Sequence, residues 1–101
     1  MSTPALSEQR VKEIIADVYM RSPRDRSLKW QEIDNDFPLS SLDEGEESLG
    51  LDSLDAVEIA TELEEVFYLV LPVEINPTEL HTVRAVMTLL GRLLKEQRES
   101  S

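Results

Sequence analysis

The sequence predicts an all-α fold, a bundle of three longer helices with one short third helix and a long first loop. Apolar residues recur at helical spacing in three segments, and no segment shows the alternation that is typical of strands. A length of 101 residues is enough for one domain only. We therefore expect a single domain over 1–101, structured from about residue 4 to residue 94.

The first helix is predicted over residues near 4–20. Thr3 and Pro4 suit an N-cap followed by a first helical position, and Ser22-Pro23 ends the pattern. Between these limits apolar residues recur at helical spacing, namely Val11, Ile14, Ile15 and Val18.

The segment 21–52 is the long first loop. It contains Trp30 and Phe37 among several aliphatic residues and is too apolar for an unstructured linker. Because long structureless loops are uncommon in compact domains, we expect one or two short helical turns that pack across the bundle.

The second helix is predicted from about Ser53 to Phe67. At 100° per residue its apolar residues form one core face, made of Ala56, Ile59, Ala60, Leu63, Val66 and Phe67. The acidic residues fall on the opposite side, namely Asp55, Glu58, Glu62, Glu64 and Glu65. Leu54 and Val57 project among these carboxylates. Isolated exposed apolar residues are common, and an apolar pair ringed by carboxylates also suits a docking spot.

The last third of the chain predicts a short helix followed by a long one. Pro72 stops any continuation of the second helix, and Asn76-Pro77 suits the N-cap and first position of a single turn. Thr82 is the expected cap of the last helix. Its apolar stripe consists of Val83, Val86, Met87, Leu90 and Leu94. We expect residues 95–101 to form a flexible tail.

The charge is strongly negative and unevenly placed. The 21 acidic and ten basic residues give a net charge of −11, and no basic residue lies between Trp30 and Val83. This excess argues against nucleic acid and anionic membranes as partners. A solvating surface and a surface that steers basic partners both remain open. No stretch approaches the roughly 20 apolar residues of a membrane span, so a cytoplasmic location is expected.

The residues that support chemistry are few. Cysteine is absent, which excludes disulfides, a thiolate nucleophile and a Cys-ligated zinc site. The acidic residues from Asp34 to Glu47 do not follow the spacing of a calcium-binding loop, so we expect no metal site. A hydrolase with Ser53 and His81 is disfavoured, because position 55 is Asp where a nucleophile elbow has Gly. His81 suits a structural role near a helix end, and we expect no catalytic residue.

Ser53 has two interpretations. Serine is strongly preferred as an N-cap, and on spacing alone a plain N-cap is favoured. The start of a helix also favours a phosphate through its unpaired N–H groups and its dipole. Ser53 is therefore also a candidate attachment point for a phosphate-containing group.

The residues around Ser53 resemble a known family. The run Leu49-Gly50-Leu51-Asp52-Ser53-Leu54-Asp55, followed by Val57-Glu58-Ile59 and Leu63-Glu64-Glu65-Val66-Phe67, resembles the modification site and second helix of acyl carrier proteins. The match continues through Leu71-Pro72 and Thr82-Val83. The resemblance implies an acyl-carrier-protein-like four-helix bundle. It also implies that a phosphopantetheinyl transferase moves 4′-phosphopantetheine from coenzyme A onto Ser53.

The resemblance further implies a function and partners. Acyl groups would be carried as thioesters on the arm, for fatty acid, polyketide or related lipid biosynthesis, by a monomeric carrier that is not itself an enzyme. Partners would be acyl transferases, ketosynthases and other acyl-processing enzymes with basic docking patches. Besides Gly50 in the motif, the implied docking residues are Asp52, Leu54, Asp55, Val57, Glu58, Glu62 and Glu65. The implied acyl pocket consists of Ala56, Ile59, Leu63, Leu80 and Val86, which core packing explains equally well.

The sequence also departs from the family pattern. The segment before the motif is long, the helix exit Tyr68-Leu69-Val70-Leu71 is unusually apolar, and His81 stands where the family often has Thr. These departures favour a specialised carrier, and the acidic motif favours an acyl or polyketide carrier over a peptidyl one. An unmodified adaptor protein with the same bundle and acidic face is the alternative.

Overall fold

The fold is all-helical in the part of the chain that the computed structural model describes, residues 6–21, 27–41, 45–71 and 77–99. These residues form three α-helices and two 3-10 turns, and they contain no strand: α1 (Glu8–Arg21), η1 (Trp30–Glu32), α2 (Ser53–Phe67), η2 (Pro77–Leu80) and α3 (Val83–Glu99). The predicted helical class is therefore confirmed. None of these helices is long and apolar enough to cross a membrane.

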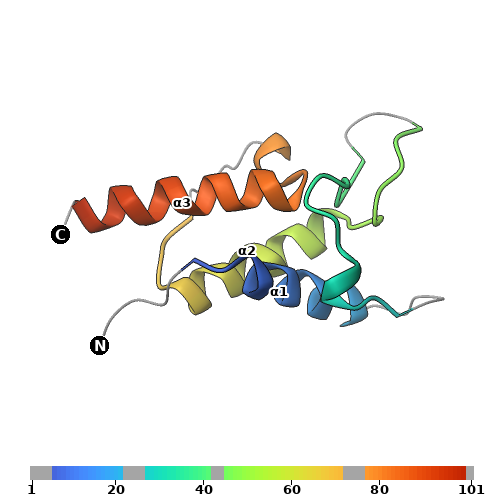
Figure 1. Cartoon of the computed structure of the whole chain (residues 1–101), viewed down its shortest axis with the longest axis horizontal. Helices are drawn as coiled ribbons and strands as arrows, with labels where there is room; N and C mark the ends of the chain where they lie inside the picture. The colour runs from blue at the N-terminus through green and yellow to red at the C-terminus, as the bar shows by residue number, and fades with distance from the viewer. Residues whose placement is uncertain (1–5, 22–26, 42–44, 72–76, 100–101) are drawn as a thin grey trace.

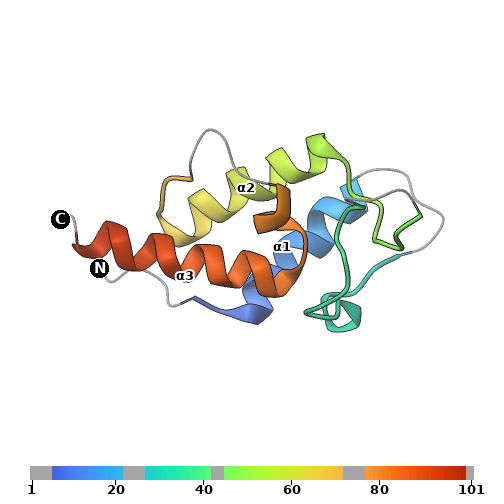
Figure 2. The same cartoon turned by 90° about the horizontal axis from the view of Figure 1, so that it is seen from above.

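α2 and α3 lie roughly along the long axis of the molecule, and α1 crosses them obliquely (Figures 1 and 2). α2 and α3 run in the same direction and α1 runs against them (Figures 1 and 2). α1 contacts α2, α3 and η1. The described part of the loop between α1 and α2 lies at the end where α2 and α3 begin (Figure 1).

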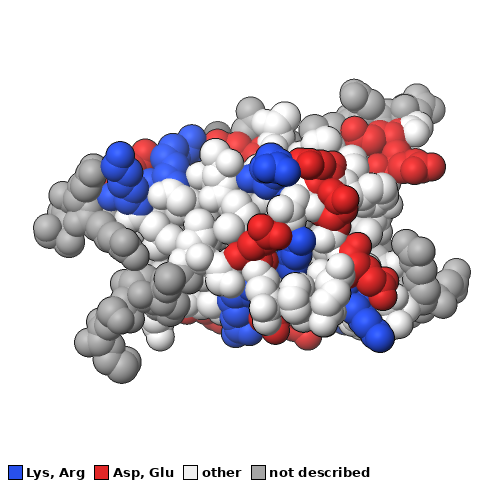
Figure 3. Space-filling view, viewed as in Figure 1, with Lys and Arg blue, Asp and Glu red and all other residues white. Residues whose placement is uncertain are grey.

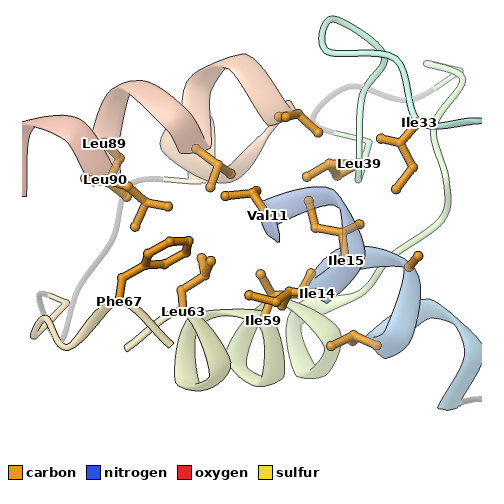
Figure 4. Close-up of a cluster of buried hydrophobic side chains, with 14 of the residues drawn as sticks. Val11, Ile14, Ile15, Ile33, Leu39, Ile59, Leu63, Phe67, Leu89 and Leu90 are labelled. Carbon is orange, nitrogen blue, oxygen red and sulfur yellow. The ribbon is translucent and has the colours of Figure 1, made fainter. Parts of the chain in front are cut away.

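A mainly aliphatic core fills the space between the helices. Its aromatic members are Tyr19 and Phe67, and Phe67 lies below Leu90 of α3 (Figure 4). The largest fully buried side chains come from all three helices: Val11, Ile15, Val18, Leu63, Phe67, Val83, Val86 and Leu90. The predicted core face of α2 is confirmed at Ile59, Leu63 and Phe67, while Ala60 and Val66 are half-buried.

The first helix begins later than predicted. Thr3 and Pro4, the expected cap, lie outside the described residues. α1 starts at Glu8, and the Ser7 hydroxyl accepts a hydrogen bond from the backbone N–H of Arg10 at 3.3 Å. This is the bond that an N-cap side chain makes, so Ser7 accounts for the later start.

The last helix begins as predicted and ends later. The Thr82 hydroxyl accepts from the N–H of Ala85 at 3.1 Å, which confirms the cap. α3 continues to Glu99, past residue 94, where the structured part was expected to end. Gln97 explains the extension, since its side chain bonds the backbone of Val70 at 3.2 and 2.9 Å. A contact with a distant segment thus supports the last turn.

The short elements differ in one respect from the expectation. The predicted short third helix is the 3-10 turn η2, so the described residues contain three α-helices; Asn76 lies outside them. The long first loop contains the 3-10 turn η1, which agrees with the expectation of one or two short helical turns. Leu28, Ile33 and Leu39 of this loop are buried, which confirms that it packs against the bundle.

Candidate functional site

Ser53 is the first residue of α2 and is exposed. The N-cap of this helix is Asp52, whose Oδ1 accepts from the backbone N–H of Asp55 at 2.9 Å. Oδ2 of Asp55 accepts in return from the N–H of Asp52 at 3.1 Å, which completes a capping box. The interpretation of Ser53 as a plain N-cap is therefore wrong. The described residues offer its hydroxyl no hydrogen-bond partner.

At Asp55 the structure differs from the helical projection. Its position opposite the core face predicts an exposed carboxylate, but the residue is 6% exposed. The physical reason is the capping box, which draws the carboxylate back over the first turn of α2. Asp52, the other member of the box, is exposed.

The backbone just before Ser53 is fixed by contacts with two distant segments. Gly50 has a φ of 79°, a left-handed conformation that favours glycine. The buried Leu51 donates its N–H to the carbonyl of Leu39 at 3.1 Å. Leu39 in turn donates to the carbonyl of His81 at 2.7 Å. The start of α2 is therefore attached to the junction of η2 and α3.

His81 has a structural position in the same region. Its ring is half-buried, and Nε2 lies 2.9 Å from Oε1 of Glu46. A hydrolase would need His81 against the Ser53 hydroxyl. Among the described residues no hydrogen bond joins these two side chains, so the site lacks the geometry of an activated serine.

The exposed side of α2 carries the apolar pair that the sequence predicts. Leu54 is 73% exposed and Val57 is 62% exposed. Glu58 and Glu65 are exposed as well, whereas Glu62 is half-buried. The pair is therefore flanked by carboxylates, as the helical projection indicates.

Arg21, the last residue of α1, was missed by the sequence analysis. Its guanidinium lies 3.6 Å from a carboxylate oxygen of Glu58, bonds Glu62, and contacts Asp17 at 2.6 Å. The hydrogen bonds that Arg21 donates, first to Glu62 and then to Asp17, raise the pKa of Arg21. No local sequence pattern predicts these contacts with α2, because they join residues about 40 positions apart. Part of the acidic surface is thus neutralised from within the molecule.

The remaining charges are unevenly placed. On the face in Figure 3, most acidic side chains lie toward the end that holds the long loop, while basic ones lie along the upper edge over α3 and also at the centre and lower edge. Arg84 bonds both carboxylate oxygens of Asp36, at 2.6 and 3.0 Å, and thereby lowers the pKa of Asp36. Within the described ranges no three potential ligands gather into a metal site.

The candidate acyl-pocket residues lie in or beside the core. Ile59, Leu63 and Val86 are buried, and Leu80 packs against the cluster, while Ala56 is half-buried. A surface groove of about 350 Å³ between η2 and α3 is lined by other residues, among them Thr78 and Arg92. In this structure Ile59, Leu63 and Val86 lie in the core and Leu80 packs against it.

The comparison with protein families matches this arrangement. A family model described as the phosphopantetheine attachment site covers residues 9–92. Because the match spans most of the sequence, the chain belongs to this family, whose members are carrier domains like acyl carrier proteins. No curated protein matches the sequence significantly. The chain is thus a phosphopantetheine carrier protein.

The family implies a 4′-phosphopantetheine group on a serine. Ser53 fits this group, because its hydroxyl is exposed and the described residues leave it unbonded. The start of a helix also favours a phosphate in general, through the helix dipole and the N–H groups of its first turn. Carrier domains of this family are generally non-catalytic and are modified by a phosphopantetheinyl transferase.

Proposed function

We propose that this protein carries acyl intermediates on a 4′-phosphopantetheine arm attached to Ser53 and delivers them to enzymes of fatty acid, polyketide or related lipid biosynthesis. The observation that supports the proposal best is the exposed Ser53 hydroxyl, which takes no part in capping α2. The bound arm supplies a thiol for thioester formation, and the chain itself has no cysteine.

The residues around Ser53 hold the backbone of the attachment point in place and leave the Ser53 hydroxyl unused. The capping box of Asp52 and Asp55 closes the first turn of α2 without using the Ser53 hydroxyl. The buried Leu51 holds the preceding backbone against Leu39. A modifying enzyme therefore meets a hydroxyl on a rigid helix end, and no internal hydrogen bond among the described residues has to break first.

Partner docking is assigned to the exposed side of α2. Leu54 and Val57 supply apolar contact, and the flanking carboxylates attract basic partner surfaces. Surface ion pairs contribute only about 0–1 kcal/mol each, so such contacts form and release quickly, as a carrier requires. The docking carboxylates are Asp52, Glu58, Glu62 and Glu65, of which Glu58 and Glu62 also contact Arg21, while the buried Asp55 contributes through the capping box. We keep the five core residues named above as the proposed acyl pocket.

Intact-mass spectrometry tests the attachment. After incubation with coenzyme A and a broad-specificity phosphopantetheinyl transferase, the wild-type chain should gain the mass of one phosphopantetheine. Ser53→Ala should gain nothing, and Ser27→Ala, a matched change of another exposed serine, should gain the same mass as wild type. An adduct that persists in Ser53→Ala contradicts the proposal, and no adduct on the folded wild type supports the unmodified adaptor instead.

A further inference from the structure

Two apolar side chains are exposed just after the end of α2, where neither the motif nor the proposed attachment uses them. Tyr68 and Val70 are each 70% exposed. Their neighbours Leu69 and Leu71 are buried at 5% and 7% exposure. The alternation shows that this short exit segment has a fixed inner side and a fixed outer side, and the outer side is apolar.

The exit segment is held by contacts on both sides. The Gln97 side chain of α3 accepts from the N–H of Val70 at 3.2 Å and donates to its carbonyl at 2.9 Å. The carboxylate of Glu64 accepts from the N–H of Leu71 at 2.9 Å. The exposed side chains therefore project from a tethered backbone. Such preorganisation lowers the entropy cost of binding.

Tyr68 also has an unfavourable backbone conformation. Its φ of 52° and ψ of 53° lie in the left-handed region, where a bulky residue is a genuine outlier. Glycine or asparagine is the usual choice at this position of a helix end. An exposed aromatic ring in a conformation that disfavours it indicates a role other than stability.

The charges next to this patch favour a basic partner. Arg21 contacts Glu58 and Glu62 near the middle of α2. Glu65, one turn before Tyr68, is exposed and has no ion-pair partner among the described residues. A second copy of the chain would bring another net charge of −11 to the patch, and an anionic lipid surface would be repelled in the same way. A protein surface with Arg or Lys beside an apolar pocket complements the patch.

The distance between Leu54 and Tyr68 along α2 determines how long a partner surface must be to contact both. At about 1.5 Å per residue, Tyr68 lies roughly 20 Å along the helix from Leu54. A partner that reaches only the region of Ser53 does not contact both places. One that lies along the whole of α2 contacts an apolar anchor at each end.

We propose that Tyr68 and Val70, with Glu65, form a second docking anchor that binds an apolar pocket flanked by Arg or Lys on an acyl-processing partner enzyme. The inference rests on the proposed function, because that function defines the partner class. It adds a footprint that extends over the C-terminal end of α2, in addition to Leu54 and Val57.

Site-specific photocrosslinking of the full chain in its native host tests the anchor. The variant Tyr68→p-benzoylphenylalanine should form an adduct with an acyl-processing enzyme, mapped by mass spectrometry to an apolar surface that contains Arg or Lys. Adding Glu65→Lys should reduce the yield several-fold. Gln9→p-benzoylphenylalanine, an exposed control position at the start of α1, should not form this adduct. A self-adduct, a lipid adduct, equal yields at both positions or no adduct overturns the inference.

Binding of the identified enzyme then separates docking from folding. Tyr68→Asn removes the ring and tolerates the left-handed backbone, so the fold should be retained while affinity falls about tenfold or more. Val70→Thr keeps the backbone bonds to Gln97 and should weaken binding in the same direction. Unchanged affinity in both variants overturns the anchor.

Loading of Ser53 is measured on the same samples. If Ser53 carries phosphopantetheine but no cross-link forms at Tyr68, the proposed anchor is wrong and the proposed function stands. If Ser53 carries no phosphopantetheine, the proposed function is wrong even where a cross-link forms at Tyr68. Failure of the anchor and failure of the proposed function are therefore distinguishable.

Discussion

The two ends of α2 expose apolar residues by different physical means. At the N-terminal end, Asp52 and Asp55 close the first turn through bonds between residues three apart. At the C-terminal end, the left-handed Tyr68 is followed by a segment that Gln97 holds from 27 positions away. The first turn of α2 is closed by its own residues, although Leu39 holds the backbone just before it, whereas the exit segment is held by a side chain of α3 as well as by Glu64.

Because of this difference, we expect the two ends of α2 to respond differently to substitutions elsewhere in the protein. Changes in the core or in α3 should disturb Tyr68 and Val70 before they disturb Ser53. Conversely, a change in the capping box should loosen the attachment point and leave the exit segment in place. Three predictions examine this contrast, from the largest expected effect to the smallest, and a fourth concerns the ion pair between Asp36 and Arg84.

Phe67→Ala should have the largest effect on stability. Phe67 is fully buried and precedes the exit segment, and truncation of a core aromatic typically costs about 3–5 kcal/mol. Denaturant unfolding measures the loss. Val57→Ala on the exposed side of the same helix is the control and should change stability by less than about 0.5 kcal/mol. Equal losses in the two variants would show that Phe67 is not a core residue.

Asp52→Ala should destabilise the protein by about 1 kcal/mol, because it removes the N-cap of α2. Ser53→Ala should leave the free energy of unfolding nearly unchanged, because Ser53 does not cap the helix. Thermal and denaturant unfolding of the two variants measure the contrast. A loss in Ser53→Ala as large as that in Asp52→Ala would restore the plain N-cap interpretation.

Tyr68→Gly should stabilise the protein by about 0.5 kcal/mol. Glycine adopts the left-handed conformation without strain, which outweighs its greater freedom in the unfolded chain. Unfolding experiments measure the gain, and Val70→Gly, in which no left-handed residue is relieved, should not show it. A loss of stability in Tyr68→Gly would mean that the ring contributes more to the fold than its 70% exposure indicates.

Asp36→Asn should have the smallest effect, and the size of that effect depends on pH. The hydrogen bonds from Arg84 lower the pKa of Asp36 below its usual value. The stabilisation is therefore present above the pKa of the unfolded chain and is lost as pH falls through the lower folded value. Asp36→Asn should melt slightly below wild type at pH 7, and the two curves should converge in strong acid. A difference that persists at the acid end would indicate another cause.

Some features could be read from the sequence because they depend on close neighbours. The bounds of α2 are those predicted, and Leu54 and Val57 are exposed as the helical projection requires. The capping box also had a local signal, since two Asp residues stand three positions apart at the predicted start. That signal was available for Asp52 and Asp55, and the plain assignment of Ser53 as cap overlooked it.

Other features could not be read in this way. Arg21 contacts Glu62 across 41 positions, and Gln97 extends α3 through its bonds to Val70. Periodicity describes one helix at a time, so it says which side of a helix is apolar but not which residue of another helix comes to lie beside it. These contacts require the relative placement of two elements.

The helical class, the extent of α2 and the motif around Ser53 follow from the order of the residues, because spacings of three and four residues define a helix and its first turn. Which carboxylates Arg21 neutralises, and how the chain leaves α2 with Tyr68 and Val70 exposed, follow from the folded arrangement of the helices. The physical reason is that these features depend on side chains that meet across the bundle, at positions that the packing of three helices sets.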